Sequence, residues 1–313
     1  MIPTQSFQYR VAVRCHTFNH ADYILDALNG FVMQKTDFPF VILLMDDAST
    51  DGTREIIQSF VSEQFDTENP DVAYERDCDY AYIQHAQHKE NKQCFIVAIY
   101  LKFNHYSRRI PKFPLLGEWR QLCQYEAICE GDDYWIDANK LQKQFDFMES
   151  HPEHSLCFHA IYRQFNDGRK KLEQRYKHDV EDCPAHHAIM GDGGYISTNS
   201  MFFRMAYRNI DYPQWATSAP VGDLPLMLVM MERGKLAFMK DVMAVYRVCT
   251  PGSWSSKRLD INYHIAFNKK IKSMWIAYDE YSHRKHHLVI MARLAKNRIM
   301  LLIKQIKNLF KKH

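Results

Sequence analysis

The sequence predicts an α/β fold with an open, Rossmann-like, mixed but mostly parallel sheet, flanked by helices and followed by a helical C-terminal extension. Short apolar segments alternate along the chain with segments in which apolar residues recur at helical spacing. Residues 40–45 are continuously apolar, as buried parallel strands are. Strand, helix, strand and helix in this order start a right-handed βαβ unit and an open α/β sheet.

Each expected element follows from its local pattern. Strands are expected over residues 10–15, 40–45, 94–100, 124–129, 157–162 and 242–248, and helices over 22–33, 53–61, 139–148, 224–232 and much of 260–313. The polar residues 166–188 are expected to form an exposed excursion. We therefore expect one large domain over residues 1–256 and a helical extension with a basic amphipathic tail over residues 257–313.

The composition is that of a globular protein. With 313 residues, 46% of them hydrophobic and 25% charged, the chain can bury a substantial core, so a largely disordered protein is excluded. The eight cysteines form no C-x-x-C pair and the N-terminal residues lack a secretory signal, which predicts a reducing, cytoplasmic setting. No apolar run approaches the roughly 18 to 20 residues that a membrane-spanning helix needs.

The end of the chain is basic and amphipathic. No acidic residue follows Glu280. Such a helix can lie on an anionic membrane surface, or it can pack its apolar stripe against the large domain, and the sequence leaves both interpretations open. The basic residues lack interleaved aromatic residues, which argues against nucleic acid as a partner. The apolar residues recur at helical intervals and are Met291, Leu294, Ile299, Leu302, Ile303, Ile306, Leu309 and Phe310.

Two adjacent acids, Asp46 and Asp47, end the second expected strand. The segment DDASTDGT at residues 46–53 has a simple structural explanation, because Asp, Ser and Thr at a strand end cap the following helix. Two adjacent carboxylates exceed what a cap requires, since like charges side by side cost energy unless partners share them. One of the pair is therefore expected to bind a ligand.

A second acidic segment, EGDDYW at residues 130–135, follows another expected strand. Glu130, Asp132 and Asp133 supply hard oxygen ligands for Mn²⁺ or Mg²⁺, which can bridge protein carboxylates to substrate phosphates. The alternative is a solvated acidic turn, against which the aromatic neighbours Tyr134 and Trp135 argue because a surface turn does not need them. Ligands of open α/β sheets bind at the carboxyl ends of strands, so both acidic segments are expected at one site.

A third acid, Asp223, lies just before the expected helix 224–232. From local sequence alone it serves equally well as a helix cap or as a general base in a cleft. The paired histidines at 85/88, 186/187 and 283/286/287 do not combine with cysteines at zinc-site spacing, and we interpret them as surface residues. Neither a P-loop nor a Gly-x-Gly-x-x-Gly turn is present.

The order of these motifs resembles the inverting family 2 glycosyltransferases with the GT-A fold, in a branch that builds bacterial surface polysaccharides. The resemblance covers about residues 10–256. Its motifs are TFNH (17–20), MQKTDFPF (33–40), DDASTDGT (46–53), NHYS (104–107), EGDDYW (130–135), KLQKQ (140–144), GDLPL (222–226), VYR (245–247) and GSWS (252–255).

The resemblance implies a role for each candidate residue. The implied contacts to the nucleotide-sugar come from Thr17, Phe18, Asn19, Asp47, Asp132 and Trp254, with Asp47 accepting a hydrogen bond from uracil if the donor is a UDP-sugar. Asp133 is implied to be the chief metal ligand, assisted by Asp132 and Glu130. Asp223 falls where the family places its catalytic base.

Two departures from the family pattern concern the donor side. Glu130 stands where many members have Asp, and Cys249 stands where the related pattern usually has His. Pro251 also interrupts the expected glycine pair. A donor contact or a closing loop is therefore expected to differ here.

Together these features predict a metal-dependent inverting glycosyltransferase that uses a nucleotide-sugar, with a glycan or lipid-linked acceptor. The expected location is cytoplasmic, with the tail offering peripheral attachment to the inner face of a bacterial membrane. Two alternatives stay open: a sugar nucleotidyltransferase, although the Gly-rich, Arg-containing N-terminal loop of that class is missing, and a non-catalytic relic that binds nucleotide-sugar.

Overall fold

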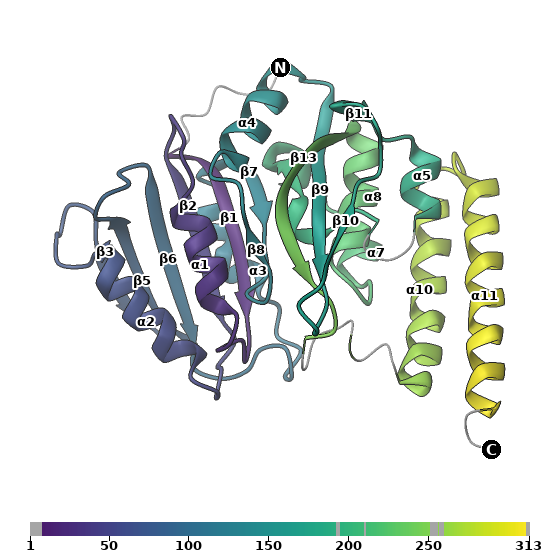
Figure 1. Ribbon diagram of the computed structural model, residues 1–313, viewed down its shortest axis with the longest axis horizontal. Coiled ribbons are helices and arrows are strands. Elements are labelled where there is room, and N and C mark those ends of the chain that lie inside the picture. The colour runs from purple at the N-terminus through teal and green to yellow at the C-terminus, as the bar shows by residue number, and fades with distance from the viewer. Residues whose placement is uncertain (1–7, 192–194, 210, 251–255, 257–259, 311–313) are drawn as a thin grey trace.

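A single mixed sheet organises the chain (Figure 1). The computed structural model describes residues 8–191, 195–209, 211–250, 256 and 260–310. Within those residues the sheet has 13 strands, and its main path runs β11-β13-β9-β12-β7-β1-β2-β6-β5-β3. Helices cover both faces, as expected of an α/β fold.

The centre of the sheet is parallel and fully buried. The strands β7 (Cys123–Ile128), β1 (Tyr9–Thr17), β2 (Phe40–Asp46) and β6 (Cys94–Leu101) pair in parallel in that order. In β2 every residue is buried, because helices cover both faces of its continuous apolar run. The parallel pairing brings the carboxyl ends of these four strands to one edge of the sheet.

The strands beyond β6 are antiparallel, and the sequence analysis did not predict them. Here β5 (Ala81–His88) pairs with β6, and β3 (Phe65–Asp66) and β4 (Tyr74–Asp77) pair with β5. Every residue of β4 is exposed, so its sequence carries no apolar signal. The surface assignment of His85 and His88 was wrong, because both are buried on β5, where His85 Nε2 lies 2.9 Å from the Tyr9 hydroxyl.

The opposite half of the sheet is mixed. The short strand β12 (Phe202–Arg204) pairs antiparallel with β7 and with β9 (His154–Gln164). The strand β13 (Lys235–Arg247) pairs parallel with β9 and antiparallel with β8 (Tyr134–Trp135). Parallel pairing is thus confined to the long strands, and the short strands are antiparallel.

Residues 166–188 are more ordered than the expected exposed excursion. The segment contributes β10 (Lys170–Glu173) on β9, β11 (Val180–Asp182) on β13, and the start of α5 (Ala185–Met190). Most residues of β10 and β11 are exposed, so their composition is that of a loop. Pairing with neighbouring strands, which local sequence does not report, makes them part of the sheet.

The two faces of the central sheet hold different helices. On one face, α1 (Ile24–Val32), α2 (Thr53–Gln64) and α4 (Lys140–Ser150) pack on alternate residues of the strands. On the other face, Leu116 and Trp119 of α3 (Phe113–Arg120) pack on the intervening residues. Each helix that the sequence predicted in this half is present.

The second half has its own core around α8 (Asp223–Arg233). This helix packs on Leu156 and Phe158 of β9, together with the short helices α6 (Met205–Asn209) and α7 (Gln214–Thr217). The 3₁₀ turn η1 (Thr198–Ser200) contacts β7, β9 and β13. This turn links the second core to the edge where the parallel strands end.

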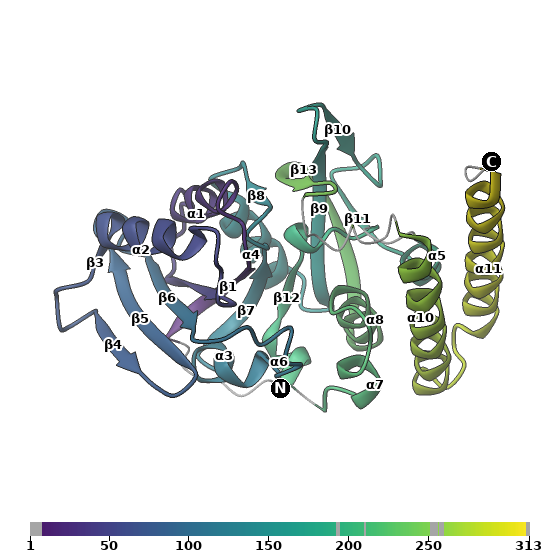
Figure 2. The same ribbon diagram turned by 90° about the horizontal axis from the view of Figure 1, so that it is seen from below.

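Two long helices complete the chain at one side of the molecule (Figures 1 and 2). Helix α10 (Ile261–Tyr281) begins where Asp260 accepts a 2.7 Å hydrogen bond from the Tyr263 amide, and its buried Trp275 and Tyr278 join the core of α8. Helix α11 (His287–Phe310) packs on α10 and α5 and is the outermost element. Among the described residues, no helix combines the length and apolarity needed to span a membrane.

Candidate functional site

The loops that follow β2 and β7 are both fastened to the end of β1. The Asp47 amide donates a 3.0 Å hydrogen bond to the Thr17 carbonyl, and the Gly131 amide donates one of 3.0 Å to the His16 carbonyl. These bonds continue the parallel pairing one step past the strands. The structure therefore brings the two acidic segments to either side of β1, as their positions at strand ends predicted.

Gly131 makes the close approach of the second loop possible. A Cβ atom built on Gly131 would lie 2.6 Å from Thr17 Oγ1 and 2.8 Å from Thr17 Cβ. Both distances are far below van der Waals contact, so only glycine fits here without displacing Thr17. Glycine is thus required at position 131 for the loop to pack against Thr17, and it also separates the carboxylates of Glu130 and Asp132.

The side chains of Asp46 and Asp47 have different partners. Asp46 accepts from the Ser49 amide at 3.1 Å and pairs with Arg54 of α2 at 2.7 Å, so it holds the turn between β2 and α2. Asp47 is buried and belongs to a separate network that includes the loop after β6. Asp46 is not a helix cap, but its carboxylate is used by these contacts in the turn, which leaves Asp47 as the ligand-binding candidate of the pair.

Asp47 fixes the loop that follows β6. Its carboxylate accepts from the His105 amide at 2.7 Å and the Tyr106 amide at 3.1 Å, and Lys112 Nζ lies 2.7 Å from Oδ2. Asn104 Nδ2 donates to the Asp47 carbonyl at 3.0 Å. A nucleobase N–H group that binds the Asp47 carboxylate therefore has to share it with one of these partners or displace one of them.

The last residue of β1 and the two residues that follow it form one wall of the site. Thr17 is buried with Oγ1 3.1 Å from His20 Nδ1, whereas the Phe18 ring is 43% exposed. Asn19 has a left-handed backbone with φ 55° and joins the turn after β2, accepting from the Thr50 amide at 2.9 Å. The exposed ring beside buried Thr17 is available for contact with a flat ligand.

The carboxylates of the second loop have unequal surroundings. Buried Asp133 accepts from the Arg247 amide at 2.8 Å, and Asp132 Oδ2 accepts from Thr250 Oγ1 at 2.8 Å. Burial, reinforced by Asp132, raises the pKa of Asp133 well above its usual range. Burial also raises the pKa of Glu130 to about 7, with Arg14 opposing the shift. The loop concentrates negative charge that a cation would relieve.

The carboxylates of this loop suit a divalent cation whose remaining coordination positions are filled by a bound ligand. No group of three or more His, Cys, Asp or Glu side chains in the described part of the chain converges as a metal centre. Mg²⁺ is commonly held by one or two carboxylates and completed by substrate phosphates and water. The crowded carboxylates of this loop, with the pKa values of Asp133 and Glu130 raised, suit that arrangement.

The two aromatic residues after the acids do not lie exposed. Trp135 is buried, and its Nε1 donates to the Asn199 carbonyl at 3.0 Å. Tyr134 is half-buried, and its hydroxyl donates to Gln164 Oε1 at 2.9 Å. These bonds hold the acidic loop against the end of β9 and against η1.

Asp223 approaches the same region through η1. It is the first residue of α8, and its carboxylate accepts from the Leu224 amide at 2.8 Å. Burial raises its pKa, with hydrogen bonds from Leu224 and the Thr198 side chain opposing the shift. Because Thr198 precedes Asn199, whose carbonyl holds Trp135, Asp223 and the acidic loop meet the same turn.

Four contacting residues were not singled out by the sequence reasoning. Lys112 pairs with Asp47, and its positive charge lowers the pKa of Glu130. The Arg247 amide donates to Asp133, and Arg247 Nη1 donates to the Asp132 carbonyl at 3.0 Å. Thr250 and Thr198 hold Asp132 and Asp223. Arg247 lies within the VYR motif, but Lys112 had no signal. Trp254 lies outside the described residues.

The fold and site define a GT-A-type α/β protein, with acidic residues at the carboxyl edge of the parallel strands. Residues 16–109 match the family model described as Glycosyl transferase family 2. This matched segment begins at the last two residues of β1 and includes β2 and Asp47.

Curated relatives include the uncharacterized protein Rv1520 of Mycobacterium tuberculosis (strain H37Rv) and the uncharacterized protein Mb1547 of Mycobacterium bovis. Each is 30% identical over 247 residues, which are 78% of this chain and 60% of the relative. The chain thus spans well under two thirds of the length of these relatives.

Two solved structures share the fold. S. aureus TarS 1-349 in complex with UDP is 16% identical, with a TM-score of 0.53 covering 85% of this chain and 65% of that one. The mannosyltransferase PcManGT from Pyrobaculum calidifontis, in complex with GDP-Man and Mn²⁺, is 12% identical, with a TM-score of 0.53 covering 94% of this chain and 74% of that one. At these identities the likeness concerns the fold.

Proposed function

We propose that the chain is a metal-dependent inverting glycosyltransferase that transfers a sugar from a nucleotide-sugar, with a UDP-sugar as the expected donor. The acceptor is a hydroxyl of a glycan or lipid-linked intermediate in bacterial surface-polysaccharide synthesis. The observation that supports the proposal is that the loops carrying Asp47 and the acidic segment 130–135 are both bonded to the end of β1. The acidic segment also bonds η1 through Trp135. Ligands named for the solved neighbours, UDP, UDP-GlcNAc and GDP-Man with Mn²⁺, are of the proposed class.

The donor would lie across the ends of β1 and β2. The exposed ring of Phe18 offers a flat face to the nucleobase, with Thr17, Asn19 and Asp47 at the rim. Lys112 acts on both Asp47 and Glu130, so its ammonium is placed to attract a diphosphate between them. Asp132 faces the ribose or sugar side in this arrangement.

Asp133, with Asp132 and Glu130 nearby, would hold Mn²⁺ or Mg²⁺ against the donor diphosphate. The cation would neutralise the negative charge that grows on the departing diphosphate. This effect commonly lowers the activation barrier by several kcal/mol. The Arg247 amide and the Thr250 hydroxyl orient the two aspartates before any ligand arrives. Such preorientation lowers the reorganisation that donor binding requires.

Asp223 would act as the general base. Its carboxylate takes the proton from the acceptor hydroxyl while that oxygen attacks the anomeric carbon and the bond to the diphosphate breaks on the opposite face. This single displacement inverts the anomeric configuration. Burial raises the pKa of Asp223, which makes the carboxylate a stronger proton acceptor than an exposed aspartate.

The test combines donor binding with turnover. A metal-supplemented thermal-shift screen of nucleotide-sugars identifies the donor, because only a bound donor raises the unfolding temperature by mass action. With that donor, Asp223→Asn should keep binding and lose turnover by about 10²- to 10⁴-fold. Asp133→Ala should lose the metal-dependent part of donor binding and of turnover. Asp241 is an exposed residue paired with Lys143, so Asp241→Asn should bind and turn over the donor as the unaltered protein does.

Each outcome separates one alternative. Donor binding without release of the nucleoside diphosphate, across a panel of acceptors, would identify a relic that binds nucleotide-sugar. Formation of a nucleotide-sugar from a nucleoside triphosphate would identify a nucleotidyltransferase. Near-normal turnover by Asp223→Asn would remove the base assignment while leaving the donor site in place.

A further inference from the structure

Two motifs of the sequence have no part in the proposed reaction so far. They are MQKTDFPF at 33–40 and KLQKQ at 140–144. The structure buries three of their polar side chains completely, those of Gln34, Lys140 and Gln144. Burying a polar group costs free energy unless a partner compensates it, and burying an amine that can carry charge costs more. The contacts of these three side chains therefore show what offsets that cost.

Gln34 fastens the chain between the acidic loop and α4. Its Nε2 donates to the Asp137 carbonyl at 2.9 Å, and its Oε1 accepts from the Leu141 amide at 3.1 Å. Because Gln34 follows α1, these bonds fix the start of α4 relative to that helix. Lys140 and Gln144 then lie one turn apart among the buried residues of α4.

Lys140 connects the acidic loop to α4. Its amine lies 4.0 Å from the centre of the Trp135 ring, and Nζ donates to Gln144 Oε1 at 2.7 Å. Trp135 is the last residue of the acidic segment, two residues after Asp133. An indole ring attracts a protonated amine placed over its face, and the attraction grows where water is excluded. The amine therefore restrains the ring that ends the acidic loop.

Trp135 and Gln144 both reach the turn η1. Trp135 Nε1 donates to the Asn199 carbonyl at 3.0 Å, and Gln144 Nε2 donates to the Ser200 carbonyl at 3.0 Å. Two successive carbonyls of the turn are thus held, one by the acidic loop and one by α4. Lys140 contacts both of these side chains. The three side chains of Trp135, Lys140 and Gln144 form one buried connection, which we call the brace.

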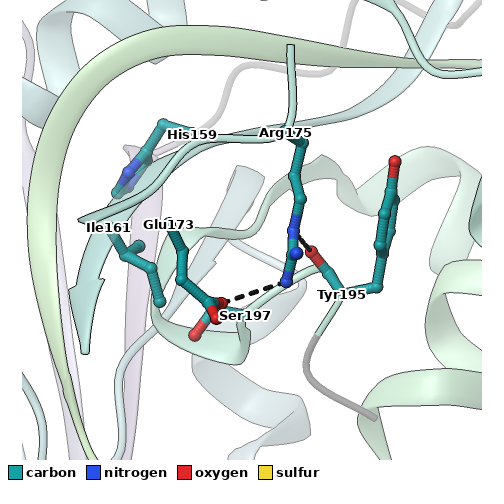
Figure 3. A pocket seen from close by; sticks show the side chains of 6 residues that line it. All are labelled: His159, Ile161, Glu173, Arg175, Tyr195 and Ser197. Carbon is teal, nitrogen blue, oxygen red and sulfur yellow. Dashed lines mark hydrogen bonds and ion pairs between the residues drawn. The ribbon is translucent and has the colours of Figure 1, made fainter. Parts of the chain in front are cut away.

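The turn η1 gives the brace a fixed support. Asn199 Nδ2 donates to the Val245 carbonyl of β13 at 2.9 Å, and Ser197 Oγ donates to Asn199 Oδ1 at 2.8 Å. Figure 3 shows Ser197 among the residues that line a small space behind the turn. That space has a volume of about 10 Å³, room for about one water molecule, so the turn is closely backed there.

We propose that Lys140 and Gln144 are positioning residues for the cation site. Through Trp135 they hold the acidic loop against η1, which keeps the carboxylates of Asp132 and Asp133 in place for a divalent cation. This inference rests on the proposed function for the cation. Neither residue touches the cation in this arrangement, and each acts through the loop. Proteins keep groups that cost stability where function needs them, which accounts for an amine buried at this place.

The first test uses UDP as the probe, with and without Mn²⁺. Lys140→Met keeps the side-chain length but removes the hydrogen-bond donor to Gln144, and Gln144→Met removes the bond to Ser200. In each variant, UDP affinity in the presence of Mn²⁺ should fall about five- to tenfold, the usual size for one net hydrogen bond, whereas metal-free UDP affinity should stay unchanged. The double variant should lose no more than either single one, because both residues act through one connection.

The second test needs no ligand. Hydrogen–deuterium exchange reports the Asp133 amide, which donates to the Glu130 carbonyl, and the Ser200 amide, which donates to the Ser197 carbonyl. Both amides should exchange about threefold faster or more in Lys140→Met, although the protein as a whole becomes no less stable to urea. A residue that served only to stabilise the fold would instead lower local protection and overall stability together.

The matched control is Lys143→Met on the same helix, because Lys143 is partly exposed and pairs with Asp137 and Asp241. Its UDP affinity and its exchange at η1 should match those of the unaltered protein. Unchanged exchange in a folded Lys140→Met protein, or equal weakening of UDP binding with and without Mn²⁺, would overturn the inference. Failure of the unaltered chain to bind UDP with Mn²⁺ would count against the proposed function, and the exchange measurement would still decide whether the brace holds the loop.

Discussion

Neighbouring side chains on one turn of this protein serve different purposes because of their partners. Asp46 and Asp47 are chemically identical, yet Arg54 and the Ser49 amide use the first, whereas the loop at 104–112 uses the second. Lys140 gives a similar lesson: the resemblance placed it in a motif, and the structure buries it completely against Trp135 and Gln144. At this scale, burial and partners decide what a residue does.

Lys140 makes stability depend on pH. Burial lowers its pKa from its ordinary value to about 7, so between pH 7 and about 10 the unfolded chain binds the proton and the folded chain does not. Stability from this group therefore rises as pH increases through that range. Lys140→Met removes the penalty and should stabilise the protein by about 1–3 kcal/mol at pH 7, with the gain shrinking toward pH 10.

Urea unfolding of both proteins at pH 7 and pH 9.5 measures this difference. The matched control is Lys143→Met on the same helix, because that ammonium is partly exposed and pairs with Asp137 and Asp241. Its loss should cost about 0–1 kcal/mol. A Lys140→Met gain that stays constant from pH 7 to pH 9.5 would contradict the titration.

Elements in this fold approach closely where the sequence provides glycine. Helix α1 lies against β8 so tightly that a Cβ on Gly30 would be 2.9 Å from the Trp135 amide nitrogen and 3.0 Å from its carbonyl oxygen. Both atoms belong to the backbone of β8, which is paired with β13. The contact between α1 and β8 therefore sets the position of the loop that carries Asp133.

Gly30→Ala should destabilise the protein because the added methyl group has to push β8 away. We expect a loss of about 1–3 kcal/mol in urea unfolding, together with weaker metal-dependent donor binding. Gly117→Ala on α3 is the matched control, since nothing lies within 4 Å of its Cβ position. That change should be neutral or stabilise by about 0.5–1 kcal/mol, and equal behaviour of the two variants would contradict the close-packing argument.

At the scale of the whole molecule, α11 has two different halves. Near its start, Ile290 is buried and Arg293 Nη1 donates to the Met190 carbonyl at 2.8 Å, so this half packs on the body. Further along, Ile299, Ile303 and Ile306 are exposed, with Arg298 and Lys304 also exposed on the same helix. Both interpretations of the tail thus have support, each in its own half. We propose that the second half lies on an anionic membrane, where a lipid-linked acceptor is found.

Vesicle co-sedimentation tests this proposal. The full chain should bind phosphatidylcholine vesicles that contain phosphatidylglycerol, and it should bind pure phosphatidylcholine vesicles weakly, because the basic residues add attraction to anionic lipid. Ile299→Ser with Ile303→Ser should reduce binding to the anionic vesicles by more than tenfold through lost apolar burial. Since both side chains are exposed, folding should be unaffected, and unchanged vesicle binding would exclude this surface.

Sequence alone determined the features that depend on local pattern. The buried strands β1, β2 and β6, the helices α1, α2, α4 and α8, and the placement of two acidic segments at strand ends all follow from apolar periodicity and chain order. These patterns act over a few residues, so the sequence displays them directly. The roles assigned to Asp47, Asp133 and Asp223 stay predictions.

Only the tertiary structure decided which groups meet. The strands β4 and β10 lack an apolar signal because pairing, which local composition does not encode, holds them in the sheet. The same applies to Lys112, which pairs with Asp47 from the loop after β6, and to Thr198, whose side chain lowers the pKa of Asp223 although β12, α6 and α7 separate the two residues along the chain. Contacts between segments far apart in the chain depend on how layers pack, and that packing brought the two acidic segments to either side of β1 and made the polar excursion part of the sheet.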